Sequence, residues 1–165
     1  MITKGSRLWN YLSSSQQALV GDGMFLLDDS ARHANTTLTD YSYLVFPFAK
    51  LYEGFLKQLF LDLGIMTERE YKSDHYRVGK TLSPNLVGRL RARSAYGQIA
   101  SKYNWDLADQ LWQTWRNGRN LVFHYFPHNL RALSLAQATE LIERICETME
   151  AAVLYTNPDQ HHQSI

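Results

Sequence analysis

Four polar side chains that could act on a phosphate group lie close together in the run RNGRNLVFH: Arg116, Arg119, Asn120 and His124. An imidazole exchanges protons near neutral pH, and a guanidinium can hold phosphate oxygens through two parallel hydrogen bonds. On an α-helix Arg116, Asn120 and His124 would form one stripe, because neighbours in this set are four residues apart. No carboxylate is interleaved with them. The stripe is therefore too polar for a core and unlike an ordinary solvated helix face.

One amphipathic helix, from Leu107 to Phe126, is predicted to carry this stripe. Asp106 can cap its first turn, because an aspartate side chain accepts hydrogen bonds from the unpaired amides there. Pro127 should end it, because proline lacks the amide donor and disfavours helical geometry at the residue before it. The predicted buried face consists of Leu107, Leu111, Trp115 and Val122.

Charge is unevenly distributed, although the whole chain carries only +1. Between residues 77 and 131, nine basic side chains oppose two acidic ones, Asp106 and Asp109, so the segment carries nine minus two, or +7. The basic residues are Arg77, Lys80, Arg89, Arg91, Arg93, Lys102, Arg116, Arg119 and Arg131. Such an excess favours a polyanionic partner, with nucleic acid first. The alternatives are a basic face that only aids solubility, or one paired with acidic residues from elsewhere in the fold.

A second candidate contact with RNA precedes the stripe. Aromatic and basic side chains alternate between Tyr71 and Lys80, and RNA-binding loops combine rings that stack on bases with cations that meet phosphates. Ordinary surface loops often have the same composition. The RNA contacts predicted from these segments are Arg77, Lys80, Arg89 and Arg93.

The rest of the chain predicts an all-α fold. Helices are expected over Arg7–Val20, from Thr37 or Thr39 to Leu63, from Ser83 to Tyr103 and from Ser134 to about Tyr155, with a short element from Phe25 to about Asn35. Glycines at 21 and 23 should end the first helix, Gly64 should stop the second, and Pro47 predicts a kink or a break. The expected architecture is an antiparallel bundle of four to five main helices, in a single domain over residues 1–156 with a flexible C-terminal tail over 157–165.

Several other kinds of chemistry have no support in the sequence. The phosphate-cradling glycine signatures, the HExxH zinc motif and the GxSxG elbow do not occur, and Pro127 separates His124 from His128. We therefore expect neither a metal nor a cofactor. The one cysteine, Cys146, lies in an apolar helical stripe and should be a buried hydrophobe, so a reducing, cytoplasmic location fits best. No signal peptide or run of roughly 18 apolar residues is visible, so no membrane is expected.

The run from Arg119 to His124 resembles the signature of the HEPN superfamily (higher eukaryotes and prokaryotes nucleotide-binding). That signature is Arg, four to six residues and then His, late on a helix of an all-α domain and often with a polar residue after the Arg. Arg119, Asn120 and His124 match it residue by residue. The segment from Phe46 to Phe60 is similar to the long helix before the signature helix in HEPN toxins of the RNase LS type.

This resemblance implies a metal-independent endoribonuclease that acts as a toxin or phage-defence effector. Such proteins are typically homodimers, with the motifs of two subunits facing across one cleft. His124 would transfer protons, Arg119 and Arg116 would hold phosphate oxygens, and Asn120 would orient the imidazole or a phosphate. The products would be a 2′,3′-cyclic phosphate and a 5′-OH. Glu53 and Lys57, which also form a favourable i, i+4 pair, are carried over as supporting residues.

One position departs from the toxins that a partner nucleotidyltransferase neutralises. In those toxins the tyrosine that is modified stands two residues after the histidine. This chain has Phe126 at that position, and its tyrosine, Tyr125, directly follows His124. A shift of one residue on a helix turns a side chain by about 100°. A separate antitoxin protein is therefore the expected regulator.

Two other interpretations stay open. The chain could be a catalytically silent HEPN module that binds RNA, a nucleotide or a protein partner through Arg119 and His124. It could also be a purely structural bundle, with His124 bonded to a backbone carbonyl and Arg119 paired with Glu53 or another carboxylate. The sequence identifies neither an RNA target nor an antitoxin.

Overall fold

The described residues of the chain fold into helices of very different lengths. The computed structural model describes residues 1–33, 37–125 and 127–158, and these ranges contain no β-strand, which confirms the predicted all-α class. The α-helices are α1 (Arg7–Tyr11), α2 (Ser14–Arg32), α3 (Ser42–Asp62), α4 (Glu68–Tyr71), α5 (Val78–Thr81), α6 (Val87–Leu90), α7 (Ala95–Lys102), α8 (Trp105–Trp115) and α9 (Leu135–Thr156). Shorter elements are the 3₁₀ turns η1 (Pro84–Leu86), η2 (Arg91–Arg93) and η4 (Pro127–Asn129), and the π-helix η3 (Arg116–Asn120).

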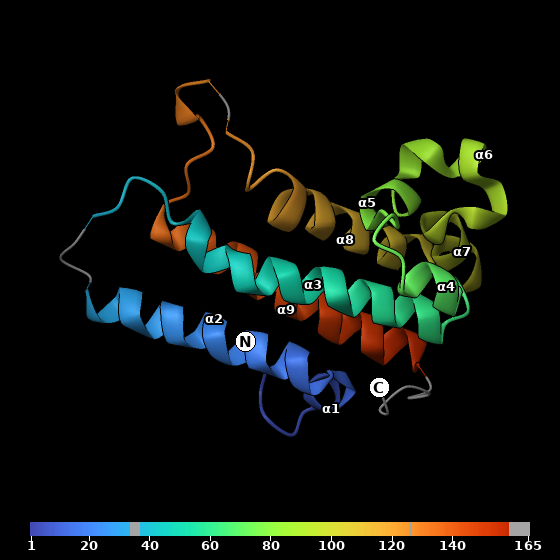
Figure 1. The fold of residues 1–165 in the computed structure, drawn as a ribbon, viewed down its shortest axis with the longest axis horizontal. Coiled ribbons are helices and arrows are strands. Elements are labelled where there is room, and N and C mark those ends of the chain that lie inside the picture. Colours follow the sequence, from blue (N-terminus) through green and yellow to red (C-terminus); the bar gives the residue numbers. More distant parts are fainter. Residues whose placement is uncertain (34–36, 126, 159–165) are drawn as a thin grey trace.

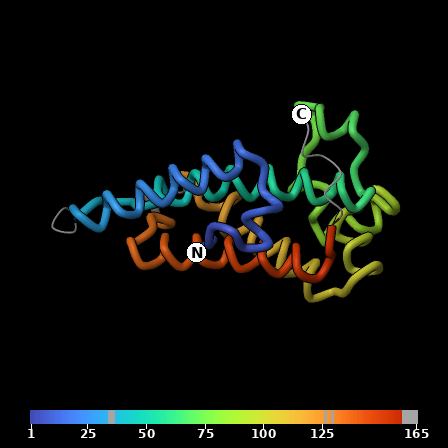
Figure 2. Tube along the Cα trace, turned by 90° about the horizontal axis from the view of Figure 1, so that it is seen from below, coloured from blue at the N-terminus to red at the C-terminus, as the bar shows by residue number. Residues whose placement is uncertain are grey.

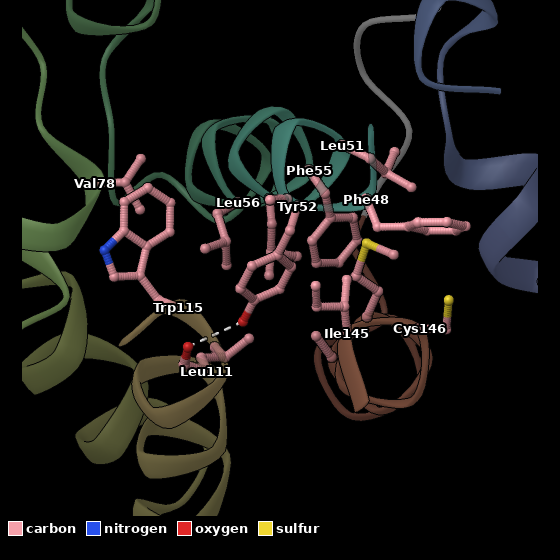
Figure 3. Close-up of a cluster of buried hydrophobic side chains, with 14 of the residues drawn as sticks. Phe48, Leu51, Tyr52, Phe55, Leu56, Val78, Leu111, Trp115, Ile145 and Cys146 are labelled. Carbon is pink, nitrogen blue, oxygen red and sulfur yellow. Dashed lines mark hydrogen bonds between the residues drawn. The ribbon is translucent and has the colours of Figure 1, made fainter. Parts of the chain in front are cut away.

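Helix α3 is the centre of the fold, and α2 and α9 both pack along it (Figures 1 and 2). Its most apolar residues are fully buried: Leu44, Val45, Phe48, Leu51, Tyr52, Phe55, Leu56, Leu59 and Phe60. Figure 3 shows five of them, from Phe48 to Leu56, together with Leu111 and Trp115 of α8 and Ile145 and Cys146 of α9. The Tyr52 hydroxyl donates to the Leu111 carbonyl oxygen at 3.0 Å, which joins α3 to α8. Helix α3 is thus contacted on more than one side, as its many apolar residues require.

The chain reverses direction between α2 and α3 and again between α8 and α9, whereas α3 and α9 run in the same direction (Figure 1). Helices α4 to α7 are short and gather at the end of the bundle where α3 ends and α8 begins. Of these helices, α5 reaches the C-terminal end of α8, because the Cβ position of Gly79 lies 2.5 Å from Trp115 Nε1.

Two expectations for the N-terminal part were wrong. Helix α2 continues through Gly21 and Gly23 to Arg32, so the predicted end at Val20 and the separate element at Phe25 do not occur. Gly23 serves packing instead, because a Cβ there would lie only 2.4 Å from the Phe48 ring. Helix α3 runs unbroken through Pro47, so of the two outcomes predicted there, a kink or a break, the break does not occur.

The start of α3 also differs from the prediction. It begins at Ser42, whose amide donates to Asp40 Oδ1 at 2.9 Å, so neither Thr37 nor Thr39 caps it. The predicted stop at Gly64 is confirmed, because this glycine has a φ of +69°, a geometry that glycine adopts without strain.

The predicted helix from Ser83 to Tyr103 is four short elements, η1, α6, η2 and α7. Arg91 has a positive φ of 50°, which ends α6. The Ser94 hydroxyl then accepts from the Gly97 amide at 3.0 Å and caps a new helix, α7. Arg89 and Arg93 consequently lie on different short elements.

The C-terminal helix agrees with the sequence. Ser134 is the N-cap of α9 and forms a capping box with Gln137, and Cys146 is buried at 1% exposure, as predicted. At its other end Asn157 is left-handed and accepts a hydrogen bond from Arg7. The rest of the predicted tail, 159–165, lies outside the described residues, as does Phe126. Within the part of the chain that the structure covers, no helix is both long and apolar enough to cross a bilayer.

Candidate functional site

Arg119 is held from two sides. Its Nε donates to Glu53 Oε2 at 3.1 Å, and its Nη2 lies 3.0 Å from the same oxygen. Its Cζ lies 5.3 Å from the centroid of the Trp115 ring, within the range of a cation–π contact. The Arg119 side chain is 42% exposed and that of Glu53 is 30% exposed. The pair is therefore restrained but still open to a ligand.

The helix that carries Arg119 does not have the predicted form. The α-helical part starts at Trp105 and ends at Trp115, and its cap is Asn104, whose Oδ1 accepts from the Leu107 amide at 2.6 Å. The predicted cap, Asp106, instead lies in the first turn, where a carboxylate favours the helix dipole.

After Trp115 the backbone widens into the π-helix η3. The amide of Leu121 donates to the carbonyl oxygen of Arg116 at 2.9 Å, a bond that spans five residues rather than four. Residues 121–123 then form a turn, and His124 and Tyr125 are in neither helix nor turn. The prediction of one helix to Phe126 was therefore wrong, and Arg116, Asn120 and His124 do not share one α-helical stripe.

Composition and packing account for this change of helix type. Asn117, Gly118 and Asn120 are poor helix formers. Gly118 is also buried against α9, and a Cβ there would lie 3.0 Å from Ile145 Cδ1. The close approach of α9 thus fixes the backbone of η3 next to Arg119.

A hollow of about 310 Å³ lies on one side of the Arg119–Glu53 pair, and we call it the smaller hollow. It brings together five of the residues that the sequence singled out: Glu53, Arg77, Lys80, Arg119 and Asn120. Three of these are cations and one is a carboxylate, so the lining has an excess of positive charge. Its apolar wall is formed by Val78, Trp112 and Trp115.

A hollow of about 630 Å³, the larger hollow, is lined by the same Arg119–Glu53 pair. Lys57 also lines it, as do Lys50 and two exposed rings, Phe46 and Phe123. Within the described residues Glu53 forms its ion pair with Arg119 and not with Lys57, so the predicted i, i+4 pair is absent there. Lys57 contributes a cation to this hollow instead.

Arg93 lies apart from these two hollows. It lines a third one, of about 420 Å³, together with Arg77 and Lys80. Its Nη2 lies 3.9 Å from Glu70 Oε1. Hydrogen bonds from the backbone amide and the hydroxyl of Thr67 lower the pKa of Glu70. That carboxylate therefore offsets part of the positive charge at Arg93.

His124, Arg116 and Arg89 are exposed, and none of them lines these three hollows. His124 follows the turn, and its amide donates to the Leu121 carbonyl oxygen at 3.4 Å. The structure thus groups Arg119 with Asn120, Arg77, Lys80 and Glu53, but it does not place His124 in the same hollow.

Sequence reasoning missed several residues of the site. Trp115 was predicted only as core, although its spacing of four from Arg119 was a signal for a helical contact. Gly79 was not singled out, and a Cβ there would lie 2.5 Å from Trp115 Nε1. Lys50, Phe46 and Phe123 were not predicted as site residues either. No pattern in one sequence indicates that α5 meets the end of α8.

This arrangement is suited to binding an anion that carries several oxygens. Nη1 of Arg119 is not among the atoms that contact Glu53, so a phosphate can meet that end of the guanidinium. Arg77 and Lys80 reach the same hollow from a separate element. Among the side chains that the structure describes, no group of three or more His, Cys, Asp or Glu residues could hold a metal ion.

Comparison of the chain with protein-family models, with curated proteins and with solved structures found no match in any of the three.

Proposed function

We propose that this chain is an endoribonuclease that acts without a metal ion, with Arg119 on the reacting phosphate and His124 as a proton-transfer group. The observation that supports it most is the smaller hollow, where Arg77, Lys80, Arg119 and Asn120 converge from segments far apart in the sequence. A phosphodiester is an anion that such a group of donors and cations binds. The resemblance of Arg119, Asn120 and His124 to the HEPN signature supplies the reaction type.

The reaction needs two proton transfers. A 2′-oxygen attacks the adjacent phosphorus while a base takes its proton, and the bond from phosphorus to the 5′-oxygen breaks while an acid protonates that oxygen. Arg119 and the other cations would stabilise the charge that develops on the phosphoryl oxygens. One His124 per chain supplies one proton-transfer group, so the proposal includes a homodimer in which His124 of the partner subunit supplies the other.

The test is RNA cleavage by the purified chain in EDTA, with the product ends identified. Wild type should produce 2′,3′-cyclic phosphate and 5′-OH ends. His124→Ala and Arg119→Ala should each lower the rate by roughly a hundredfold or more, the scale of a lost acid–base or charge-stabilising group. His33→Ala and Arg144→Ala are the matched controls, because each removes an exposed residue of the same type outside the described hollows. Both variants should cleave RNA like wild type.

Equal cleavage by wild type and both site variants would mean that a contaminant or another site cuts the RNA. If none of the proteins cleaves, the proposed enzyme activity is wrong.

A second function, RNA binding without cleavage, is favoured by the position of His124, which does not line the smaller hollow that Arg119 lines. Arg119, oriented by Glu53, would then bind a phosphate without acting in a reaction. A wild-type protein that binds RNA in an Arg119-dependent manner but leaves it intact over long incubation would establish this function instead.

A further inference from the structure

The larger hollow is lined both by exposed aromatic rings and by cations. Phe46 extends from α3, and Phe123 follows η3. Their ring centroids are 5.7 Å apart and their planes are inclined by 79°. Phe46 is 56% exposed and Phe123 is 41% exposed. A planar ligand can therefore stack on one of these partly exposed rings while the other, nearly perpendicular, meets its edge.

Cations line the same hollow. Lys50, Lys57 and Arg119 contribute three positive charges, and the one carboxylate among the lining residues, Glu53, is paired with Arg119. A ligand that suits this hollow therefore has a flat apolar part and a negative charge next to it. A nucleotide within a single strand has both.

The side-chain amide of Gln16 also lines the larger hollow. Gln16 Oε1 accepts from the Ser13 amide at 2.9 Å, which orients the side chain. Its Nε2 lies toward Gly54, 3.4 Å from where a Cβ of that residue would be. An amide group in that position can donate to a carbonyl oxygen on the edge of a base.

We propose that the larger hollow binds one unstacked base of single-stranded RNA, with its ring against Phe46 and Phe123 and its neighbouring phosphates near Lys50 and Lys57. This inference rests on the proposed function and adds the form of the substrate. Because Arg119 and Glu53 line both hollows, the bound base lies next to the nucleotide whose phosphate meets Arg119. A paired strand cannot place a base there without unstacking it, so single strands are preferred.

A second copy of the chain is a less suitable occupant of this hollow. A twofold interface brings the same surface patch of both subunits together. If such an interface lay over the larger hollow, it would bring Lys50 and Lys57 of the two subunits close to one another, whereas the homodimer of the proposed function meets at Arg119 and His124. Nucleic acid instead supplies the opposite charge.

The experiment measures binding with 2′-O-methyl oligonucleotides, which lack the 2′-hydroxyl and cannot be cleaved by this route. Fluorescence anisotropy compares a single strand that carries bases throughout with a strand of equal length whose central nucleotides are abasic. Wild type should bind the strand with bases roughly tenfold or more tightly, the scale of one base stacked on an aromatic ring. A Phe46→Leu/Phe123→Leu double variant should lose that difference, with little change in affinity for the abasic strand.

Phe25→Leu is the matched control, because Phe25 is 69% exposed on α2 and does not line the hollow. It should bind both strands like wild type. Thermal unfolding checks that the double variant is folded, and light scattering checks its oligomeric state.

A ring-dependent preference for bases supports the subsite. The proposal is overturned if the double variant keeps the preference, if wild type has none, or if the only effect is the dissociation of an oligomer. These outcomes are independent of cleavage. A wild-type enzyme that cuts RNA without preferring bases would contradict the subsite alone, and a ring-dependent preference in a protein that never cuts would contradict the nuclease alone.

Discussion

At the scale of single residues, Arg119 has its orientation fixed before any ligand binds. Glu53 contacts two of its nitrogens, and the Trp115 ring lies against its guanidinium. A side chain that is already oriented loses less conformational entropy on binding. The contact from Trp115 to Arg119 could be predicted from their spacing. The contact between Glu53 and Arg119 depends on how α3 packs, so from the sequence Glu53 was only one of several carboxylates that could pair with Arg119.

Two buried hydroxyls show how single polar groups support this fold. Thr114 on α8 and Thr148 on α9 lie 2.9 Å apart, at 1% and 0% exposure. Thr114→Val should destabilise the protein by about 1–3 kcal/mol, because it leaves the Thr148 hydroxyl without this partner. The Thr114→Val/Thr148→Val double variant should recover most of that loss. Urea unfolding of wild type, both single variants and the double variant measures these free energies of unfolding. The argument would be contradicted if the double variant lost as much stability as the two single variants together.

The buried thiol of Cys146 gives a prediction about pH. Burial raises its pKa to about 11, so the native protein at pH 8 should react with a thiol-specific disulfide reagent only as fast as it unfolds. The folded state keeps this proton at a pH where the unfolded chain has lost it. The contribution of Cys146 to stability should therefore decline as pH rises from about 9 toward 11. Unfolding of wild type and Cys146→Ala across that range measures the decline, and rapid labelling in native buffer would refute the burial argument.

At the scale of elements, α5 positions the end of α8 through a glycine. A Cβ on Gly79 would lie 2.5 Å from Trp115 Nε1, so Gly79→Ala should displace the indole and cost about 1–3 kcal/mol of stability, as overpacking does. Because Trp115 also contacts Arg119, this variant should lower Arg119-dependent RNA binding. Gly88→Ala in α6 is the control, since nothing lies within 4 Å of its Cβ position. Equal stability and RNA binding in the two variants would show that the contact does not position Trp115.

Long helices were easier to predict than short ones. The apolar spacing of α3 and the capping box of α9 each determine a helix through interactions within it, and both were identified. The segment from Ser83 to Tyr103 has a similar apolar pattern, but Arg91 has a positive φ, which a side chain disfavours and a sequence pattern does not indicate. Gly23 was misread for a different reason. Glycine can break a helix or allow a close contact, and here the contact with Phe48 decides.

At the scale of the whole molecule, the fold places only some cations of the basic segment at the smaller hollow. Arg77 and Lys80 share the smaller hollow with Arg119, whereas Arg89 does not. The sequence correctly indicated a basic region, but it could not rank these cations, because their ranking depends on how α4 to α7 pack against α8.

That ranking predicts the salt dependence of RNA binding. The affinity of wild type for a single strand should fall as salt increases, and Lys80→Ala should reduce the slope of log K against log salt by about 0.7, the effect of one lost phosphate contact. Arg89→Ala should change the slope much less. Anisotropy titrations at several NaCl concentrations measure these slopes, and a larger effect of Arg89→Ala would move the RNA contact away from the smaller hollow.

The π-helix η3 also constrains how the length of this chain can vary. Its five residues close a turn that spans one residue more than an α-turn does. A π-turn takes up its extra residue in about the rotation of one α-turn, so deleting one residue between 116 and 120 would leave an ordinary α-turn and nearly keep the direction of the side chains after it. The same deletion within α8 would instead rotate every later side chain by about 100°. Among descendants of this sequence, a loss of one residue should therefore be tolerated in η3 more readily than in α8.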